Sequence, residues 1–133
     1  MAVYPEPPPL AKRHKLAKAI HRIAMAMPDA WEDHPWGDVV YKVGEKIFVF
    51  VGPNSGGMTV KAPREDAAGL CELPGIAPSA YIGRHGWITL APEVVADLAF
   101  AEGLIHASYE LIAPKKKSSP QRTQRIAKER RSI

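Results

Sequence analysis

The chain has only one cysteine among its 133 residues, so it cannot form an internal disulfide or a zinc site built from several thiolates. That residue, Cys71, lies in an apolar stretch with Leu70 and Leu73, where we expect a small buried hydrophobe rather than a nucleophile. No stretch is apolar over the length needed to span a bilayer, and the amino terminus lacks a secretory signal. We therefore expect a soluble, cytoplasmic protein that does not contact a membrane.

Motifs for catalysis and for binding a cofactor or metal are also missing. The sequence contains no HExxH, no CxxC and no nucleophile elbow. The glycine-rich loop at residues 52–57 lacks the Gly-Lys-Ser/Thr ending of a phosphate-binding loop. Five histidines are present, but His14 and His21 are about two helical turns apart, which is too far for joint chelation. The sequence therefore predicts no catalytic residue, no metal site and no cofactor.

The positive charge of the chain is concentrated at its carboxyl-terminal end. Residues 1–113 contain ten Lys and Arg against thirteen Asp and Glu, a net formal charge of −3, whereas residues 114–133 contain eight against one, a net of +7. A tail of this composition cannot build a core, so we predict that it is disordered. It can act as a non-specific phosphate-binding arm, a solubilising segment or a ligand for an acidic protein. Its first cations, Lys115, Lys116 and Lys117, are candidate phosphate contacts.

Apolar periodicity predicts two long helices that flank antiparallel strands. The first helix covers residues 10–27 and contains five Lys and Arg but no Asp or Glu, and the last helix runs from Pro92 to Ile112. Gly103 lies inside the last helix, where glycine is unfavourable, so close packing is expected there. Strands are expected at residues 39–43, 46–51, 58–61, 80–82 and 87–90, with a short helix at residues 63–72.

This order of elements, α-β-β-β-α-β-β-α, predicts an α+β fold: a two-layer sandwich with an antiparallel sheet and helices on one face. The chain is 46% hydrophobic and is large enough for one core but too small for two. We predict a Pro-rich flexible segment at residues 1–9, one folded domain at residues 10–113 and a disordered basic tail at residues 114–133.

Four cations of the predicted domain are candidates for contacts to nucleic-acid phosphates. Lys42 and Lys61 lie in mid-strand and are expected to face outward from the sheet, either as an ordinary solvated surface or as a small cationic patch. We group Lys46 and Arg64 with them. Contacts of this kind position a nucleic acid without reading its sequence.

Two further sets of residues are candidates for binding. Arg84 and His85 occupy the tip of the second predicted hairpin, which either enters a nucleic-acid groove as a wing or carries ordinary surface residues. Trp36 and Trp87 lie beside glycines near strand ends, where tryptophan can close the edge of a core or form the wall of a groove. With Tyr109 they define an alternative function, a module that binds a small ligand or a protein.

Five short segments occur in an informative order: Pro35-Trp36-Gly37, YKVGEKIF at residues 41–48, Thr59-Val60-Lys61, Trp87-Ile88-Thr89 and SYELI at residues 108–112. Through them, over roughly residues 10–113, the chain resembles the MmcQ/YjbR family of small bacterial proteins. The resemblance implies a frataxin-like (CyaY-like) fold and a double-wing DNA-binding role. Frataxin-like proteins that handle iron have an acidic first helix; the basic first helix expected here disfavours an iron chaperone. We therefore expect a non-catalytic DNA-binding protein that contacts mainly phosphates.

Overall fold

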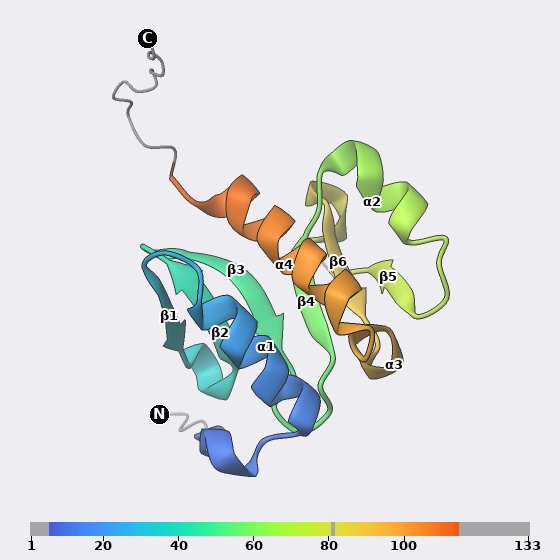
Figure 1. Cartoon of the computed structure of the whole chain (residues 1–133). Helices are drawn as coiled ribbons and strands as arrows, with labels where there is room; N and C mark the ends of the chain where they lie inside the picture. The colour runs from blue at the N-terminus through green and yellow to red at the C-terminus, as the bar shows by residue number, and fades with distance from the viewer. Residues whose placement is uncertain (1–5, 81, 115–133) are drawn as a thin grey trace, which may run out of the picture.

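A six-stranded antiparallel sheet forms the centre of the fold (Figure 1). The computed structural model describes residues 6–80 and 82–114. The strand order across the sheet is β1-β2-β3-β4-β6-β5. The α+β class with an antiparallel sheet is thus confirmed. The strands are β1 (Ala30–Asp33), β2 (Val39–Val43), β3 (Lys46–Val51), β4 (Met58–Lys61), β5 (Ile76–Pro78) and β6 (Trp87–Leu90).

The helices pack on one face of this sheet. Helices α1 and α4 cross that face side by side, and α2 lies next to α4 (Figure 1). Among the described residues, none of the helices has the length and apolar character needed to cross a bilayer. The helices are α1 (Lys15–Met25), α2 (Arg64–Leu70), α3 (Pro92–Val95) and α4 (Leu98–Ile112), and single 3₁₀ turns occur at Leu10–Lys12 (η1), Pro35–Gly37 (η2) and Gly83–His85 (η3).

The period of two along each strand separates core residues from residues on the opposite side. On β2, Val39, Tyr41 and Val43 are buried beneath the helices, and Gly44 adopts a φ of 61° in the two-residue turn to β3. We call the side of the sheet away from α1 and α4 the outer sheet face. The cross-strand pairs and the alternation of burial place on it Trp31, Lys42, Phe50, Thr59, Lys61, Trp87 and Thr89.

A buried hydroxyl joins α4 to the sheet at an irregularity in the strand pairing. Between Tyr41 and Lys42 the register of β2 against β3 shifts, so Phe48 has no partner on β2. The Ser108 hydroxyl donates a hydrogen bond to the Phe48 carbonyl (2.7 Å) and accepts one from the Lys61 amide (3.0 Å). Ser108 is fully buried, so it satisfies two backbone groups that the sheet leaves unpaired.

The structure corrects the predicted order of elements in three places. β1 was not expected, because its Ala-Trp-Glu-Asp sequence has little β propensity and its formation depends on pairing with β2. The second hairpin uses β5 at residues 76–78 instead of residues 80–82, since Ile76 pairs with Leu90. The last helix is divided at Asp97, whose carboxylate accepts a hydrogen bond from the Phe100 amide (3.3 Å) and caps α4.

The expected close packing at Gly103 is also wrong. A methyl group at this position would meet no atom within 4 Å outside the local helix, and the residue is exposed.

Candidate nucleic-acid interface

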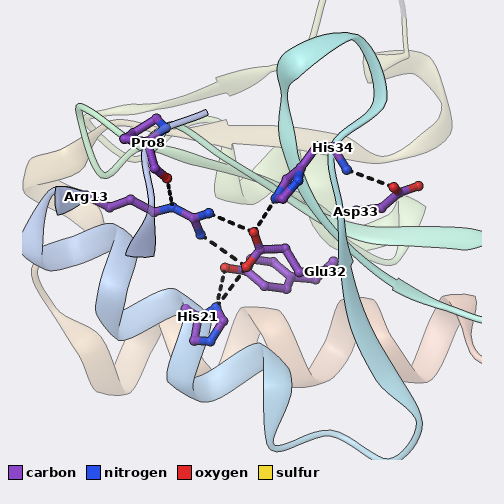
Figure 2. A network of polar contacts seen from close by, with 7 residues as sticks. Pro8, Arg13, His21, Glu32, Asp33 and His34 are labelled. Carbon is purple, nitrogen blue, oxygen red and sulfur yellow. Dashed lines mark hydrogen bonds and ion pairs between the residues drawn. The ribbon is translucent and has the colours of Figure 1, made fainter. Parts of the chain in front are cut away.

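A polar network fixes α1 against the edge strand β1 (Figure 2). The Arg13 guanidinium donates two hydrogen bonds to the Glu32 carboxylate, Nη2 to Oε2 at 2.8 Å and Nη1 to Oε1 at 3.1 Å. Its Nε donates to the Pro8 carbonyl (2.9 Å), which ties residues 6–9 to the same point. The Arg13 side chain is only 4% exposed and the Glu32 side chain 15% exposed, so this ion pair is largely shielded from water.

Two histidines and a tyrosine complete this network. His21 Nδ1 lies 3.1 Å from Glu32 Oε1 and 3.0 Å from the Tyr41 hydroxyl, and His34 Nε2 contacts Glu32 Oε2. Burial alone would raise the pKa of Glu32, but hydrogen bonds from Arg13 and His34 outweigh it and lower that pKa to about 2. The Glu32 carboxylate is therefore charged at neutral pH and is occupied by its neighbours.

This cluster has the features of a structural network. Hydrogen bonding to Glu32 raises the pKa of Arg13, and burial, with the charge of Glu32, raises the pKa of Tyr41. Neither shift brings a group closer to titration at neutral pH. Within residues 6–80 and 82–114, no three His, Cys, Asp or Glu side chains are placed to hold a metal ion together. Together with the buried apolar side of α1, the network holds the opposite side of the helix towards water.

The water-facing side of α1 carries cations that make no ion pair within the described part of the chain. Lys15, Lys18 and Arg22 are exposed and follow one another at intervals of three and four, which places them on one side of the helix. Lys12 of η1 is exposed just before them. We call these four residues the α1 basic stripe. None of them forms an ion pair with another described residue, and α1 contains no Asp or Glu.

The sequence predicts a basic first helix that disfavours iron binding, but it does not single out these cations as phosphate contacts. The signal was present, namely five Lys and Arg with no Asp or Glu over residues 10–27. The sequence did not show that Arg13 turns inward while the other four face water. Glu102 of α4 lines a groove between α1 and α4 together with Arg22, and its Oε2 lies 3.6 Å from His106 Nε2.

Lys42 lies on the outer sheet face, as expected, but it is already occupied. Its ammonium group is 2.7 Å from Asp33 Oδ2 and 5.2 Å from the centre of the Trp31 ring. The hydrogen bond from Lys42 lowers the pKa of Asp33, so the carboxylate is charged at neutral pH. The pair is locally neutral, and a phosphate at Lys42 would compete with Asp33.

Lys46, Lys61 and Arg64 lie near one end of the sheet. Lys61 pairs with Trp87 across the β4–β6 ladder, Lys46 begins β3 at the β2–β3 turn, and Arg64 begins α2 directly after β4. None of the three makes an ion pair within the described part of the chain. Glu45 lies beside Lys46, and Glu65 with Asp66 follows Arg64. This second set of cations is therefore mixed with acidic residues.

The candidate wing is a short turn that packs against the body of the domain. Residues Gly83–His85 form the 3₁₀ turn η3, and the Gly86 carbonyl accepts a hydrogen bond from the Ala62 amide (2.8 Å). A Cβ at Gly86 would lie 2.5 Å from the Ala62 carbonyl oxygen, so the turn is closely applied to the end of β4. The Arg84 side chain and Lys115, Lys116 and Lys117 lie outside what the structure describes.

The aromatic residues proposed for a ligand groove do not share one surface. Trp87 is on the outer sheet face, where its ring meets Phe50 edge to face at 5.6 Å. Tyr109 is on α4, packs against Phe48 at 5.3 Å and donates its hydroxyl to the Pro28 carbonyl (2.7 Å). The sheet separates the two rings. Trp36 belongs to η2, and its side chain is outside the described part of the structure.

A groove of about 470 Å³ does exist on the outer sheet face. Phe50, Thr59 and Thr89 line it from the sheet, and the two threonine hydroxyls are hydrogen-bonded to each other at 2.9 Å. Asp38, directly before β2, also lines the groove. The other lining residues come from the strands, the loop after β3 and the segment after β5: Val39, Val51, Gly52, Ser55, Gly57, Met58, Ser79, Ala80 and Ile82. We call this the outer-sheet groove.

Comparison of the chain with models of protein families tests the family resemblance that the sequence segments suggested. The family model named YjbR matches residues 25–111, which is more than half of the chain. The chain belongs to the YjbR family. Among curated proteins no match was found.

Two solved structures of similar proteins share the fold. DR2400 of Deinococcus radiodurans, whose domain is described as DUF419, is 18% identical with a TM-score of 0.67; the alignment covers 81% of this chain and 86% of that protein. A Pseudomonas syringae protein is 22% identical with a TM-score of 0.55, over 71% of this chain and 96% of the other. Identities this low establish a common fold and no common activity. The frataxin-like character of the fold remains a prediction.

Proposed function

We propose that this YjbR-family chain is a non-catalytic DNA-associated protein that binds duplex phosphates through the α1 basic stripe and the basic tail. The observation that carries the proposal is the exposure of Lys15, Lys18 and Arg22 on one side of α1, with Lys12 exposed just before them, all without ion pairs among the described residues. Cations held by acidic neighbours lose much of their attraction for a polyanion. Free cations keep it.

The dimensions of the stripe suit a nucleic-acid backbone. From Lys15 to Arg22 the helix rises about 10 Å, at 1.5 Å per residue. One DNA strand carries a phosphate for roughly every 3.4 Å of its axis, so this length matches about three phosphates. The remainder of residues 1–113 is net acidic, which favours approach by the α1 side.

The tail adds further positive charge to the chain. Its eight Lys and Arg against one Glu exceed the charge of the stripe, and they follow the domain directly at residue 114. A tail alone would bind any polyanion. The stripe supplies the part of the binding that depends on the fold.

Two matched triple variants of the full chain test this assignment. The stripe variant loses three charges by the substitutions Lys15→Gln, Lys18→Gln and Arg22→Gln. The control variant loses three charges elsewhere, by substitution of Lys46, Lys61 and Arg64 with Gln. At about 0.1 M salt we expect the stripe variant to bind duplex DNA roughly 500-fold more weakly, because three lost phosphate contacts at about 0.9 each lower the salt exponent by about 2.7. The control should change affinity much less.

The opposite ranking would place the interface on the sheet. Equal affinities for both variants and the wild type would show that the tail alone binds. Circular dichroism melting of each variant confirms that the fold is retained, since all the replaced side chains are at least partly exposed.

A further inference from the structure

We propose that the outer-sheet groove binds a small organic cation, an arylalkylamine, with its ammonium group at Asp38 and its ring against Phe50. The proposal does not depend on DNA binding. The groove lies on the side of the sheet away from α1, and its lining residues take no part in the α1 basic stripe.

The groove has the size and composition of a small-ligand site. Its volume of about 470 Å³ falls in the range of clefts that bind small molecules, which are typically apolar with a few polar groups that fix orientation. Phe50 provides an aromatic surface, and its edge-to-face contact with Trp87 holds the ring in place. Apart from the Asp38 carboxylate, the polar side chains are hydroxyls, among them those of Ser55, Thr59 and Thr89.

The charge of the lining selects a cation. Asp38 is the one ionisable residue among the described groove-lining residues, and it forms no ion pair with any described residue. A ligand carboxylate or phosphate would meet Asp38 with no compensating lysine or arginine in the described lining. An ammonium group would be attracted both to Asp38 and to the face of an aromatic ring.

The loop beside the groove offers little to an anion. The Gly52 amide donates to the Gly57 carbonyl (2.8 Å), the Gly56 amide donates to the Gly52 carbonyl (2.9 Å), and the Gly57 amide donates to the Ser55 hydroxyl (3.2 Å). These amides are occupied within the loop. They do not form the open set of N–H groups that holds a phosphate.

The distance from Asp38 to the pair of Thr59 and Thr89 indicates how long the ligand should be. Thr59 and Thr89 share one hydrogen bond, which leaves one hydroxyl hydrogen and several lone pairs for a ligand. Asp38 precedes β2 and Thr59 is on β4, so two strand spacings separate them, roughly 10 Å at about 4.8 Å each. A molecule with an ammonium group at one end and a phenolic hydroxyl at the other spans about this distance.

Tyramine is a suitable probe, with 3-(4-hydroxyphenyl)propionate as the anion of matching size. In a ¹H–¹⁵N NMR titration of the full chain without nucleic acid, we expect tyramine to bind in the millimolar range typical of so small a ligand. The shifts should centre on the amides of Phe50, Thr59 and Thr89, and the anion should bind at least several-fold more weakly.

Two substitutions test the named contacts. Asp38→Asn should weaken tyramine binding about 3- to 5-fold, as expected for the loss of an exposed ion pair. Thr59→Val should also weaken tyramine binding, but it should not improve binding of the anion. Asp66→Asn on α2 is the matched control and should leave binding unchanged. The proposal is overturned if tyramine causes no shifts up to about 20 mM, if the shifts map elsewhere, if the anion binds equally well, or if Asp38→Asn has no effect.

Discussion

Glu32→Gln should destabilise the domain strongly, although it only replaces a carboxylate by an amide of the same shape. The change keeps the shape of the side chain but leaves the Arg13 guanidinium, only 4% exposed, without its counter-charge. A pKa lowered from 4.5 to about 2 corresponds to roughly 3 kcal/mol at about 1.36 kcal/mol per unit. Because the Glu32 side chain is still 15% exposed and partly screened, we expect a loss of about 2 kcal/mol in the free energy of unfolding at pH 7.

The pH dependence gives this prediction a definite sign. The folded-state pKa of Glu32 is below its unfolded-state value, so its contribution is complete above about pH 4.5 and is lost as the pH falls towards 2. The stability difference between wild type and Glu32→Gln should therefore shrink steadily over that interval. Asp33 also has a lowered pKa, but it is present in both proteins and cancels in the difference.

Urea denaturation at several pH values measures both effects. Glu72→Gln, which neutralises an exposed acid without an ion pair among the described residues, is the control and should be nearly neutral. A cycle that adds Arg13→Met should recover part of the loss, because the buried guanidinium is then absent. A Glu32→Gln loss below about 0.5 kcal/mol, or one that does not depend on pH, would refute the reasoning.

Two further predictions concern α4. Gly103→Ala should stabilise the protein by roughly 1 kcal/mol in thermal or urea unfolding, since the added methyl meets nothing within 4 Å. A loss of stability would mean that the site is more crowded than the structure indicates. Ser108→Ala should cost about 1–3 kcal/mol, because the Phe48 carbonyl and the Lys61 amide both lose a buried partner, and hydrogen exchange at the Lys61 amide should accelerate. Unchanged exchange there would contradict the role given to Ser108.

The sequence was sufficient to predict the elements that carry their own periodicity. The β2–β3 hairpin follows from β-branched runs around Gly44, and the basic helix follows from its apolar stripe. β1 could not be predicted in this way, because two acidic residues and a tryptophan form a strand only where β2 offers an edge. The break at Asp97 lies within a continuous apolar periodicity, so only the cap at that residue distinguishes two helices from one.

Candidate binding residues were harder to predict than strands, because tertiary neighbours determine whether a cation is exposed or already paired with an acid. Lys42 faces outward as expected, yet Asp33 and Trp31 occupy its ammonium group. Arg13 looks like its neighbours on a basic helix, but its partner Glu32 comes from a strand that periodicity did not show. The groove at Phe50 arises from residues on four strands and two loops, which no local pattern joins.

The dependence of duplex DNA affinity on salt tests the central claim most directly. For the full wild-type chain, a plot of log affinity against log salt should be steep, and its slope should become shallower by roughly 2.7 when Lys15, Lys18 and Arg22 are replaced together, at about 0.9 per phosphate contact. An unchanged slope would place the phosphate contacts away from α1. Absence of binding by the wild type at low salt would contradict the nucleic-acid function altogether.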